Sequence, residues 1–190
     1  MARYIKALDD GRLIISPEPK PRYKDVGVKY CPYDAHTIDL KLGDKISVPK
    51  SGKFAYDFTV SGSIADFIGK TSEKHVLEKN RPFTLPPNQF ILAQTLEIVG
   101  LPTNEGVSHL AARIERKSSL ARCGLLVHFT APTVHPGWMG PLTLEITNLS
   151  KTSMNLHYGM PIAQLIIEEV RGRIFENLSQ FQGQSTPEGD

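Results

Sequence analysis

The chain has 190 residues and a formal net charge of +2 at pH 7. This length is enough for one compact domain with a sizeable core, and the charge is too small to predict a nucleic-acid surface. The two cysteines have no CxxC spacing, and no stretch approaches the ~20 apolar residues of a membrane helix. We therefore expect a cytoplasmic protein with no nucleic-acid or membrane partner.

The first half of the chain has the pattern of β-strands. Residues 1–6 lack the long apolar run of a signal peptide. Apolar and polar residues alternate over residues 38–42, and the alternation resumes at residues 46–48 after a Gly-Asp pair. Residues 90–93 indicate a buried strand, whereas residues 61–70 fit either a short helix or an irregular loop.

The second half adds one short helix and further strands. We predict a helix over residues 118–123, ended by Gly124, followed by a buried strand over residues 125–127. In residues 142–146 the apolar side chains share one face, which leaves Thr143, Glu145 and Thr147 on the other.

Glycine and proline separate these runs at short intervals, which favours an all-β sandwich or barrel. The chain shows no internal repeat and no linker. From Gly172 onward it is polar and rich in turn residues. We therefore expect a β domain over residues 1–171 and a closing segment over residues 172–190 that is mobile until a ligand binds.

Two features suggest a binding site. Ser118 and Ser119 at a helix start, with Arg122 one turn later, can bind a phosphate, although a capped and solvated helix has the same residues. Glu145 is a lone acid in an apolar strand, which is costly to bury without a role. A half-exposed polar residue on a sheet face is the alternative for Glu145.

The segment Lys117-Ser-Ser-Leu-Ala-Arg122, together with the Thr-Leu-Glu of residues 143–145, resembles the dCTP deaminase branch of the dUTPase-like superfamily. Other matching segments follow in family order: residues 7–17, 37–43, 83–87, 90–97, 159–166 and 180–184. The resemblance implies a dUTPase-like distorted β-barrel or jelly roll with one or two short helices. It also implies a homotrimer whose active sites lie at subunit interfaces.

The resemblance assigns roles to individual residues. It implies that Glu145, Arg122 and Ser118 are catalytic. It places further residues against the substrate: Lys117, Ser119, Thr130, Ala131, His135, Gln164 and Gln184. It implies that His128 and Trp138 shape the pocket. Core packing is the alternative role for His128 and Trp138, and strand-end structure is the alternative for Gln164.

Two positions depart from the family pattern. Lys117 stands where the family has arginine, so a planar fork of donors becomes a point charge. His135 stands where the family has an aspartate that contacts the sugar 3′-hydroxyl and orients the water attacking phosphorus. A histidine there has no fixed negative charge at neutral pH, which argues against strong diphosphatase activity.

The residues also bear on the chemistry of deamination. Zinc deaminases carry H-x-E and P-C-x-x-C motifs, and this sequence contains neither. A glutamate can instead take the proton of the attacking water and return it to the base and to the leaving amine. We therefore expect no zinc or other protein-bound metal, and Mg²⁺ only as a companion of the triphosphate.

The first hypothesis is a dCTP deaminase that releases dUTP and ammonia and so supplies dUMP and dTTP synthesis. A bifunctional enzyme that continues to dUMP and diphosphate is the second. A trimer of the same fold that binds nucleotides without catalysis is the third, and it is argued against by the presence of Ser118, Arg122 and Glu145.

Overall fold

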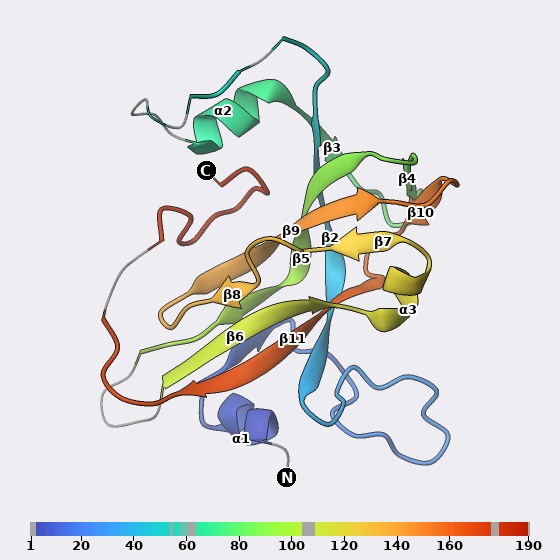
Figure 1. The fold of residues 1–190 in the computed structure, drawn as a ribbon. Helices are drawn as coiled ribbons and strands as arrows, with labels where there is room; N and C mark the ends of the chain where they lie inside the picture. The colour runs from blue at the N-terminus through green and yellow to red at the C-terminus, as the bar shows by residue number, and fades with distance from the viewer. Residues whose placement is uncertain are drawn as a thin grey trace.

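The computed structural model describes residues 3–53, 55–57, 59, 64–103, 109–175 and 179–189. Its strands form a nine-stranded antiparallel sheet and a separate two-stranded one (Figure 1). The large sheet contains β1 (Ile14–Ser16), β2 (Thr37–Pro49), β3 (Ser72–Val76), β5 (Phe90–Gly100), β6 (His109–Arg116), β7 (Leu125–Val127), β8 (Thr133–Val134), β9 (Met139–Asn148) and β11 (Pro161–Val170). The small sheet contains β4 (Phe83–Leu85) and β10 (Met154–Leu156). The helices are α1 (Arg3–Asp9), α2 (Ile64–Thr71) and α3 (Ser118–Arg122).

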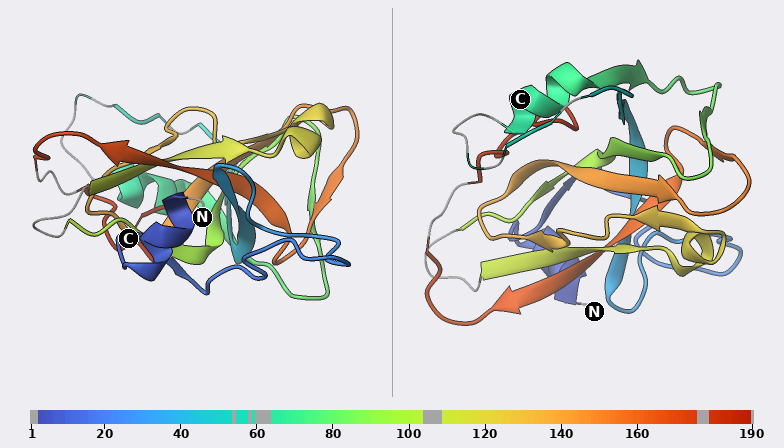
Figure 2. Two further views of the ribbon diagram at one scale, coloured as in Figure 1. Left: turned by 90° about the horizontal axis from the view of Figure 1, so that it is seen from below. Right: turned by 45° about the horizontal axis from the view of Figure 1, so that its top comes forward.

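The long strand β2 makes the sheet curl. Its first part pairs with β11, whereas its later part pairs with β5 and β3, so it passes through both halves of the sheet (Figures 1 and 2). The register with β5 shifts between Leu42 and Ile46, as at a β-bulge. A Cβ on Gly43 would lie 3.0 Å from the carbonyl oxygens of Gln94 and Thr95. Glycine therefore permits the close approach of the two strands at this bend.

The sheet has the order β7-β9-β5-β2-β11-β6-β8, so β7 and β8 are its two ends. Residues 128–132 connect these strands and cross from one end to the other. The backbone N–H of His128 donates to the carbonyl of Glu145 at 2.6 Å, and that of Ile114 donates to Pro132 at 2.8 Å. The crossing loop is thus anchored on both sides of the curled sheet, where it can form the wall of a pocket.

The predicted all-β fold is confirmed, and the period of two in β9 has the expected result. Leu142, Leu144 and Ile146 are buried in the core, whereas Thr143 and Glu145 on the other face are half-buried. The interrupted strands predicted at residues 38–48 are one strand, because the bulge at Gly43 changes the register without ending the pairing.

The helices differ from expectation in one respect. α3 confirms the predicted helix, and α2 shows that residues 64–71 of the ambiguous segment are helical; residues 61–63 lie outside the described part. α1 was not predicted, so the described chain has three short helices. It buries Tyr4, Ile5 and Ala7. With seven residues, the helix is too short for a helical period to be recognised in the sequence. None of the helices in these residues is long and apolar enough to cross a membrane.

A buried carboxyl in β5 makes the stability of the fold depend on pH. Glu97 is 1% exposed and accepts the backbone N–H of Lys41 at 2.8 Å. Burial raises the pKa of Glu97 to about 7, while the hydrogen bond from Lys41 opposes the rise. In the unfolded chain the pKa of a glutamate is about 4.3, so the folded state binds the proton more tightly.

We expect Glu97→Gln to reduce this pH dependence. In the wild type the contribution of Glu97 is fully present below about pH 4 and is lost as the pH rises through about 7, because the carboxylate must then ionise in the core. The loss is about 2–4 kcal/mol at 1.36 kcal/mol per pKa unit. Urea unfolding at pH 5 and pH 8 measures it. Glu168→Gln, on an exposed side chain, is the control, and equal pH slopes for wild type and Glu97→Gln would contradict the assignment.

Candidate active site

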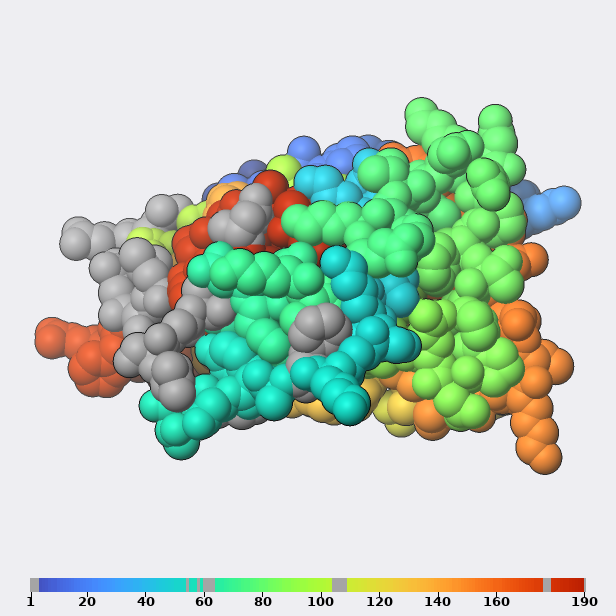
Figure 3. Space-filling model, turned by 90° about the horizontal axis from the view of Figure 1, so that it is seen from above, coloured from blue at the N-terminus to red at the C-terminus, as the bar shows by residue number. Residues whose placement is uncertain are grey.

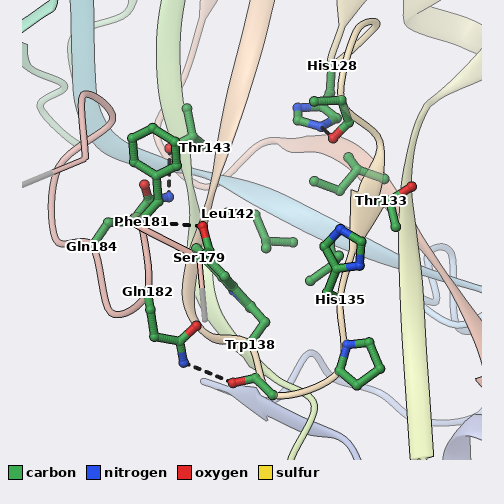
Figure 4. Close-up of a pocket in the computed structure, with 15 residues that line it drawn as sticks. His128, Thr133, His135, Trp138, Leu142, Thr143, Ser179, Phe181, Gln182 and Gln184 are labelled. Atoms are coloured by element: carbon green, nitrogen blue, oxygen red, sulfur yellow. Dashed lines mark hydrogen bonds between the residues drawn. The ribbon is translucent and has the colours of Figure 1, made fainter. Parts of the chain in front are cut away.

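A pocket of about 210 Å³ lies between the loop after β7, strand β9 and the carboxy-terminal segment (Figure 4). Its lining comes from β6, residues 128–138, β9 and the tail: Ile114, His128, Ala131, Thr133, Val134, His135, Pro136, Gly137, Trp138, Leu142, Thr143, Ser179, Phe181, Gln182 and Gln184. Five of the predicted site residues are among them, namely His128, Ala131, His135, Trp138 and Gln184. The crossing loop and the tail therefore form opposite walls of one pocket.

Glu145 lies two residues beyond Thr143 on the same face of β9. Its carboxylate accepts hydrogen bonds from the Thr130 hydroxyl at 2.5 and 2.6 Å and from the Thr130 backbone N–H at 3.2 Å. These bonds fix the carboxylate beside the His128–Ala131 end of the pocket. The structure thus brings together Glu145, Thr130 and Ala131, which the sequence placed in one site.

His128 holds the shape of the crossing loop. Its φ of 52° lies in the left-handed region, which is uncommon for residues other than glycine. Its Nε2 donates to the Ala131 carbonyl at 2.7 Å, while Nδ1 is buried and has no hydrogen-bond partner among the described residues. The ring therefore bridges the 128–131 turn beside the pocket, and its role in shaping the pocket stays a prediction.

The turn at residues 135–138 forms the lower rim of the pocket in Figure 4. Gly137 has a φ of +87° and donates its N–H to the Leu101 carbonyl at 2.7 Å. Trp138 is half-buried, with its indole N–H donating to the Gly140 carbonyl at 3.2 Å. His135 is exposed at the rim, where its ring is accessible to a ligand.

The carboxy-terminal segment packs over the pocket. Gln184 is buried and donates to Thr143 Oγ1 at 2.8 Å and to the Pro141 carbonyl at 3.2 Å. Gln182 donates to the Gly137 carbonyl at 2.9 Å. Beyond the pocket, Glu188 lies 3.8 Å from Lys74 of β3, and Figure 3 shows the tail beside the residues of α2 and β3. The structure therefore contains the closed arrangement of the tail.

We expect ligand to stabilise this closed arrangement. Amide hydrogen exchange in residues 179–189 should slow when a non-hydrolysable dCTP analogue is added, because the closed tail shields the pocket and gains contacts to the nucleotide. Exchange in β5, which lies in the core, serves as the internal control. If residues 179–189 exchange slowly without the analogue, or if the analogue does not change their rate, the tail is not a lid.

The serine and arginine side chains of α3 lie outside this pocket. Ser118, Ser119 and Arg122 are exposed, and in the described part of the chain no hydrogen bond or ion pair joins them to Glu145 or to the pocket lining. Lys117 is the N-cap residue of α3, but its side chain makes no cap hydrogen bond and instead donates to Asp39 at 2.5 Å. Gln164 donates to Asp39 at 3.0 Å and to Thr37 at 3.2 Å.

The predicted site residues thus form two groups. Directly after α3, Leu125 pairs with Asn148 of β9, whereas the pocket lies at Leu142 and Thr143. At about 3.3 Å per residue, Leu125 is roughly 15–20 Å along β9 from Leu142 and Thr143 and roughly 10 Å from Glu145. In Figure 1, α3 lies at the opposite end of the molecule from β8 and the tail. Within the described residues of one chain, the α3 group therefore makes no contact with the pocket lining.

Sequence reasoning missed two residues of these groups. Thr143 binds the tail glutamine, and its position on the face of Glu145 was a usable signal. Asp39 joins Lys117 to Gln164, and it is a lone acid in an apolar strand, the same signal that singled out Glu145. Among the described residues, no group of three or more His, Cys, Asp or Glu side chains could hold a metal ion.

Comparison with known proteins decides the family. The model of the dCTP deaminase-like family matches residues 2–170. The chain belongs to the dCTP deaminase-like family. It is 36% identical over 170 residues to the dCTP deaminase of Pectobacterium atrosepticum, and the alignment covers 87% of this chain and 80% of that protein. It is 33% identical over 160 residues to the dUMP-forming dCTP deaminase of Dictyoglomus thermophilum, covering 84% and 74%.

A solved structure supports the fold of this dCTP deaminase-like chain. The crystal structure of 2′-deoxycytidine 5′-triphosphate deaminase from Agrobacterium tumefaciens matches with a TM-score of 0.58 and 19% sequence identity. The match covers 86% of this chain but 45% of that chain, so the chain spans about half the length of that protein. At this identity the likeness shows the fold alone.

Proposed function

We infer that the chain is a dCTP deaminase, which replaces the 4-amino group of dCTP by oxygen and releases dUTP and ammonia. The observation that carries this inference is the carboxylate of Glu145, held by Thr130 beside the pocket of a chain whose relatives are named dCTP deaminases. Its product supplies the synthesis of dUMP and dTTP.

Glu145 acts as general base and then as general acid. It takes one proton from a water as the water oxygen bonds to C4 of cytosine, and it delivers that proton to the base nitrogen N3. In the second half of the reaction Glu145 takes the proton of the C4 hydroxyl and delivers it to the amine. The C4=O double bond forms as the C4–N4 bond breaks with its electron pair on nitrogen, and ammonia leaves. The sequence lacks the H-x-E and P-C-x-x-C motifs of zinc deaminases, so we assign the activation of water to Glu145 without zinc.

The loop and the tail position the base. Thr130 and Ala131 supply groups of the crossing loop to cytosine and to the water, and His128 fixes the turn that presents them. Trp138 packs at the rim, where His135 can reach the sugar. Gln184 closes the opposite wall and excludes water other than the nucleophile.

We assign the rest of the site to the α3 group of a neighbouring subunit. Arg122 and Ser118 would hold the water and the base, while Ser119 and Lys117 would contact the triphosphate. The separation of the two groups along β9 supports a homotrimer with active sites at its interfaces, because a neighbour can supply what one chain keeps apart. In this arrangement Mg²⁺ accompanies the triphosphate rather than a protein site.

Gln164 stays a predicted phosphate contact. Both hydrogens of its amide are used within the chain, by Thr37 and Asp39, so a direct bond to phosphate requires one of them to be released. The free thiols of Cys31 and Cys123 fit the reducing cytoplasm in which we place the enzyme.

The function is tested by separating the products of dCTP. Protein freed of zinc by a chelator, whose metal content is then measured, is incubated with dCTP and Mg²⁺. We expect equal amounts of ammonia and uracil nucleotide. Binding of dCTP without ammonia release would instead indicate the nucleotide-binding trimer, and activity that is lost with zinc and restored by it would overturn the role of Glu145.

The same assay distinguishes the two enzyme hypotheses through His135. We expect dUTP to accumulate, because an imidazole at the rim is a poorer orienter of the water that attacks phosphorus than a short carboxylate. His135→Asp is expected to raise the yield of dUMP. Wild-type protein that converts dCTP directly to dUMP, without free dUTP, would make the bifunctional enzyme the better description.

A further inference from the structure

A second cleft lies around the buried carboxylate of Asp39, away from the base pocket. Asp39 is 5% exposed, and its oxygens accept hydrogen bonds from Tyr30 at 2.8 Å, Lys117 at 2.5 Å and Gln164 at 3.0 Å. Burial, and next the hydrogen bond to Asp39, raise the pKa of Tyr30, so its hydroxyl remains a donor. The buried charge is thus compensated by three donors from three segments of the chain.

The cleft is polar and has a volume of about 300 Å³. It is lined by Lys24 and Lys29 from the loop between β1 and β2, and by Asp39, Lys117 and Gln164. Asp34 also lines it, and one oxygen of that carboxylate accepts the Ala35 N–H at 2.7 Å. The ammonium groups of Lys24 and Lys29 make no hydrogen bond or ion pair within the described residues. Three lysines and two aspartates leave the lining with a positive charge.

We propose that this cleft binds the outer phosphates of the nucleotide, with Lys24 and Lys29 as phosphate contacts and Asp39 as the positioning residue for Lys117. This inference rests on the proposed function, and it adds a subsite to it. The sequence of residues 117–122 does not predict that Lys24 and Lys29 take part in the site. The fold places these two lysines of the β1–β2 loop in the same cleft as Lys117.

The contacts of Lys117 support this role for Asp39. An ammonium has three N–H donors, and one bond to Asp39 leaves two for a ligand. The side chain is already ordered by Asp39, so a phosphate does not have to immobilise a free lysine. The same bond partly neutralises the charge of Lys117. Lys24 and Lys29 have no partner within the described residues that neutralises them, so they supply the remaining positive charge that attracts phosphate.

The subsite predicts that affinity depends on the number of phosphates. We expect the double change Lys24→Ala with Lys29→Ala to raise the Kd for dUTP about tenfold and to leave the Kd for dUMP unchanged, since dUMP lacks the outer phosphates. The control is Lys79→Ala with Lys151→Ala, which removes two exposed lysines outside the cleft. An unchanged Kd for dUTP, or an equal rise for dUMP and dUTP, would overturn the proposal.

Asp39→Asn tests the positioning role. It keeps the shape but removes the charge, so we expect KM for dCTP to rise several-fold with kcat nearly unchanged, and Asp39→Glu to recover part of the affinity. A fall in kcat at unchanged KM would contradict this role. Circular dichroism and thermal unfolding identify a variant that fails to fold, and the lysine variants then carry the test.

Binding of inorganic tripolyphosphate separates this inference from the proposed function. We expect wild type to bind it more tightly than the Lys24→Ala, Lys29→Ala variant, whether or not the protein deaminates dCTP. Lysine-dependent binding by a protein that releases no ammonia would leave the subsite standing and remove the deaminase assignment. Ammonia release together with tripolyphosphate binding that does not depend on the two lysines would support the deaminase assignment and overturn the subsite.

Discussion

Glu145→Gln is expected to stop deamination while nucleotide binding remains. The amide keeps the size of the side chain and can still bond to Thr130, but it cannot accept the proton of the attacking water. Loss of a general base typically lowers the rate by ~10²–10⁴-fold. Ammonia release under saturating dCTP measures kcat, and equilibrium binding of dUTP measures affinity.

A matched substitution shows whether the effect belongs to this position. Glu168→Gln changes an exposed glutamate that pairs with Arg113 on the β11–β6 side of the sheet, and we expect it to retain wild-type turnover. Near-normal ammonia release by folded Glu145→Gln protein would remove Glu145 from the mechanism. A loss of dUTP binding comparable to the loss of rate would indicate a binding role instead.

Arg122→Ala is expected to have the second largest effect. Arg122 is exposed on α3 and without an ion pair in the described chain, so its guanidinium is free to bind a ligand held by a neighbouring subunit. Loss of a charged donor that stabilises the reacting atoms lowers the rate by about 10²–10³-fold. Ser118→Ala removes one neutral hydroxyl, and we expect a smaller loss of about tenfold.

The control for this pair is Arg81→Ala, which removes an exposed arginine that belongs neither to α3 nor to the pocket lining. We expect its kinetics to match the wild type, and we expect the thermal stability of all three variants to change little, because these side chains are on the surface. Full activity of Arg122→Ala would contradict a role in the site. It would instead support the alternative that the Lys117–Arg122 segment is only a capped, solvated helix.

Local patterns predicted much of the sheet and of the pocket. The alternation in residues 142–146 gave the buried and half-buried faces of β9, and the Ser-Ser-Leu-Ala-Arg run gave α3. The family resemblance placed His128 and Trp138 at a pocket, and both line the pocket of the structure, where the loop makes turns with unusual backbone angles. The positive φ values of His128 and Gly137 are examples.

Long-range arrangement was not predictable from the sequence. The ion pair of Asp39 with Lys117 joins residues 78 positions apart, and it exists because β2, β11 and β6 are neighbours in the sheet. The position of α3 relative to the pocket also depends on tertiary structure, since it is set by the pairing of β7 with the Ile146–Asn148 end of β9. No local periodicity contains this information.

Restoration of activity by mixing two inactive variants tests the central claim, that Glu145 of one subunit and Arg122 of another form one deaminating site. Glu145→Gln and Arg122→Ala chains are co-expressed in equal amounts, and ammonia release from dCTP is compared with each variant alone. Random assembly of a trimer gives about a quarter of its interfaces both intact residues, so we expect about a quarter of the wild-type activity. If the mixture is no more active than the separate variants while the wild type is active, the site is not shared between subunits.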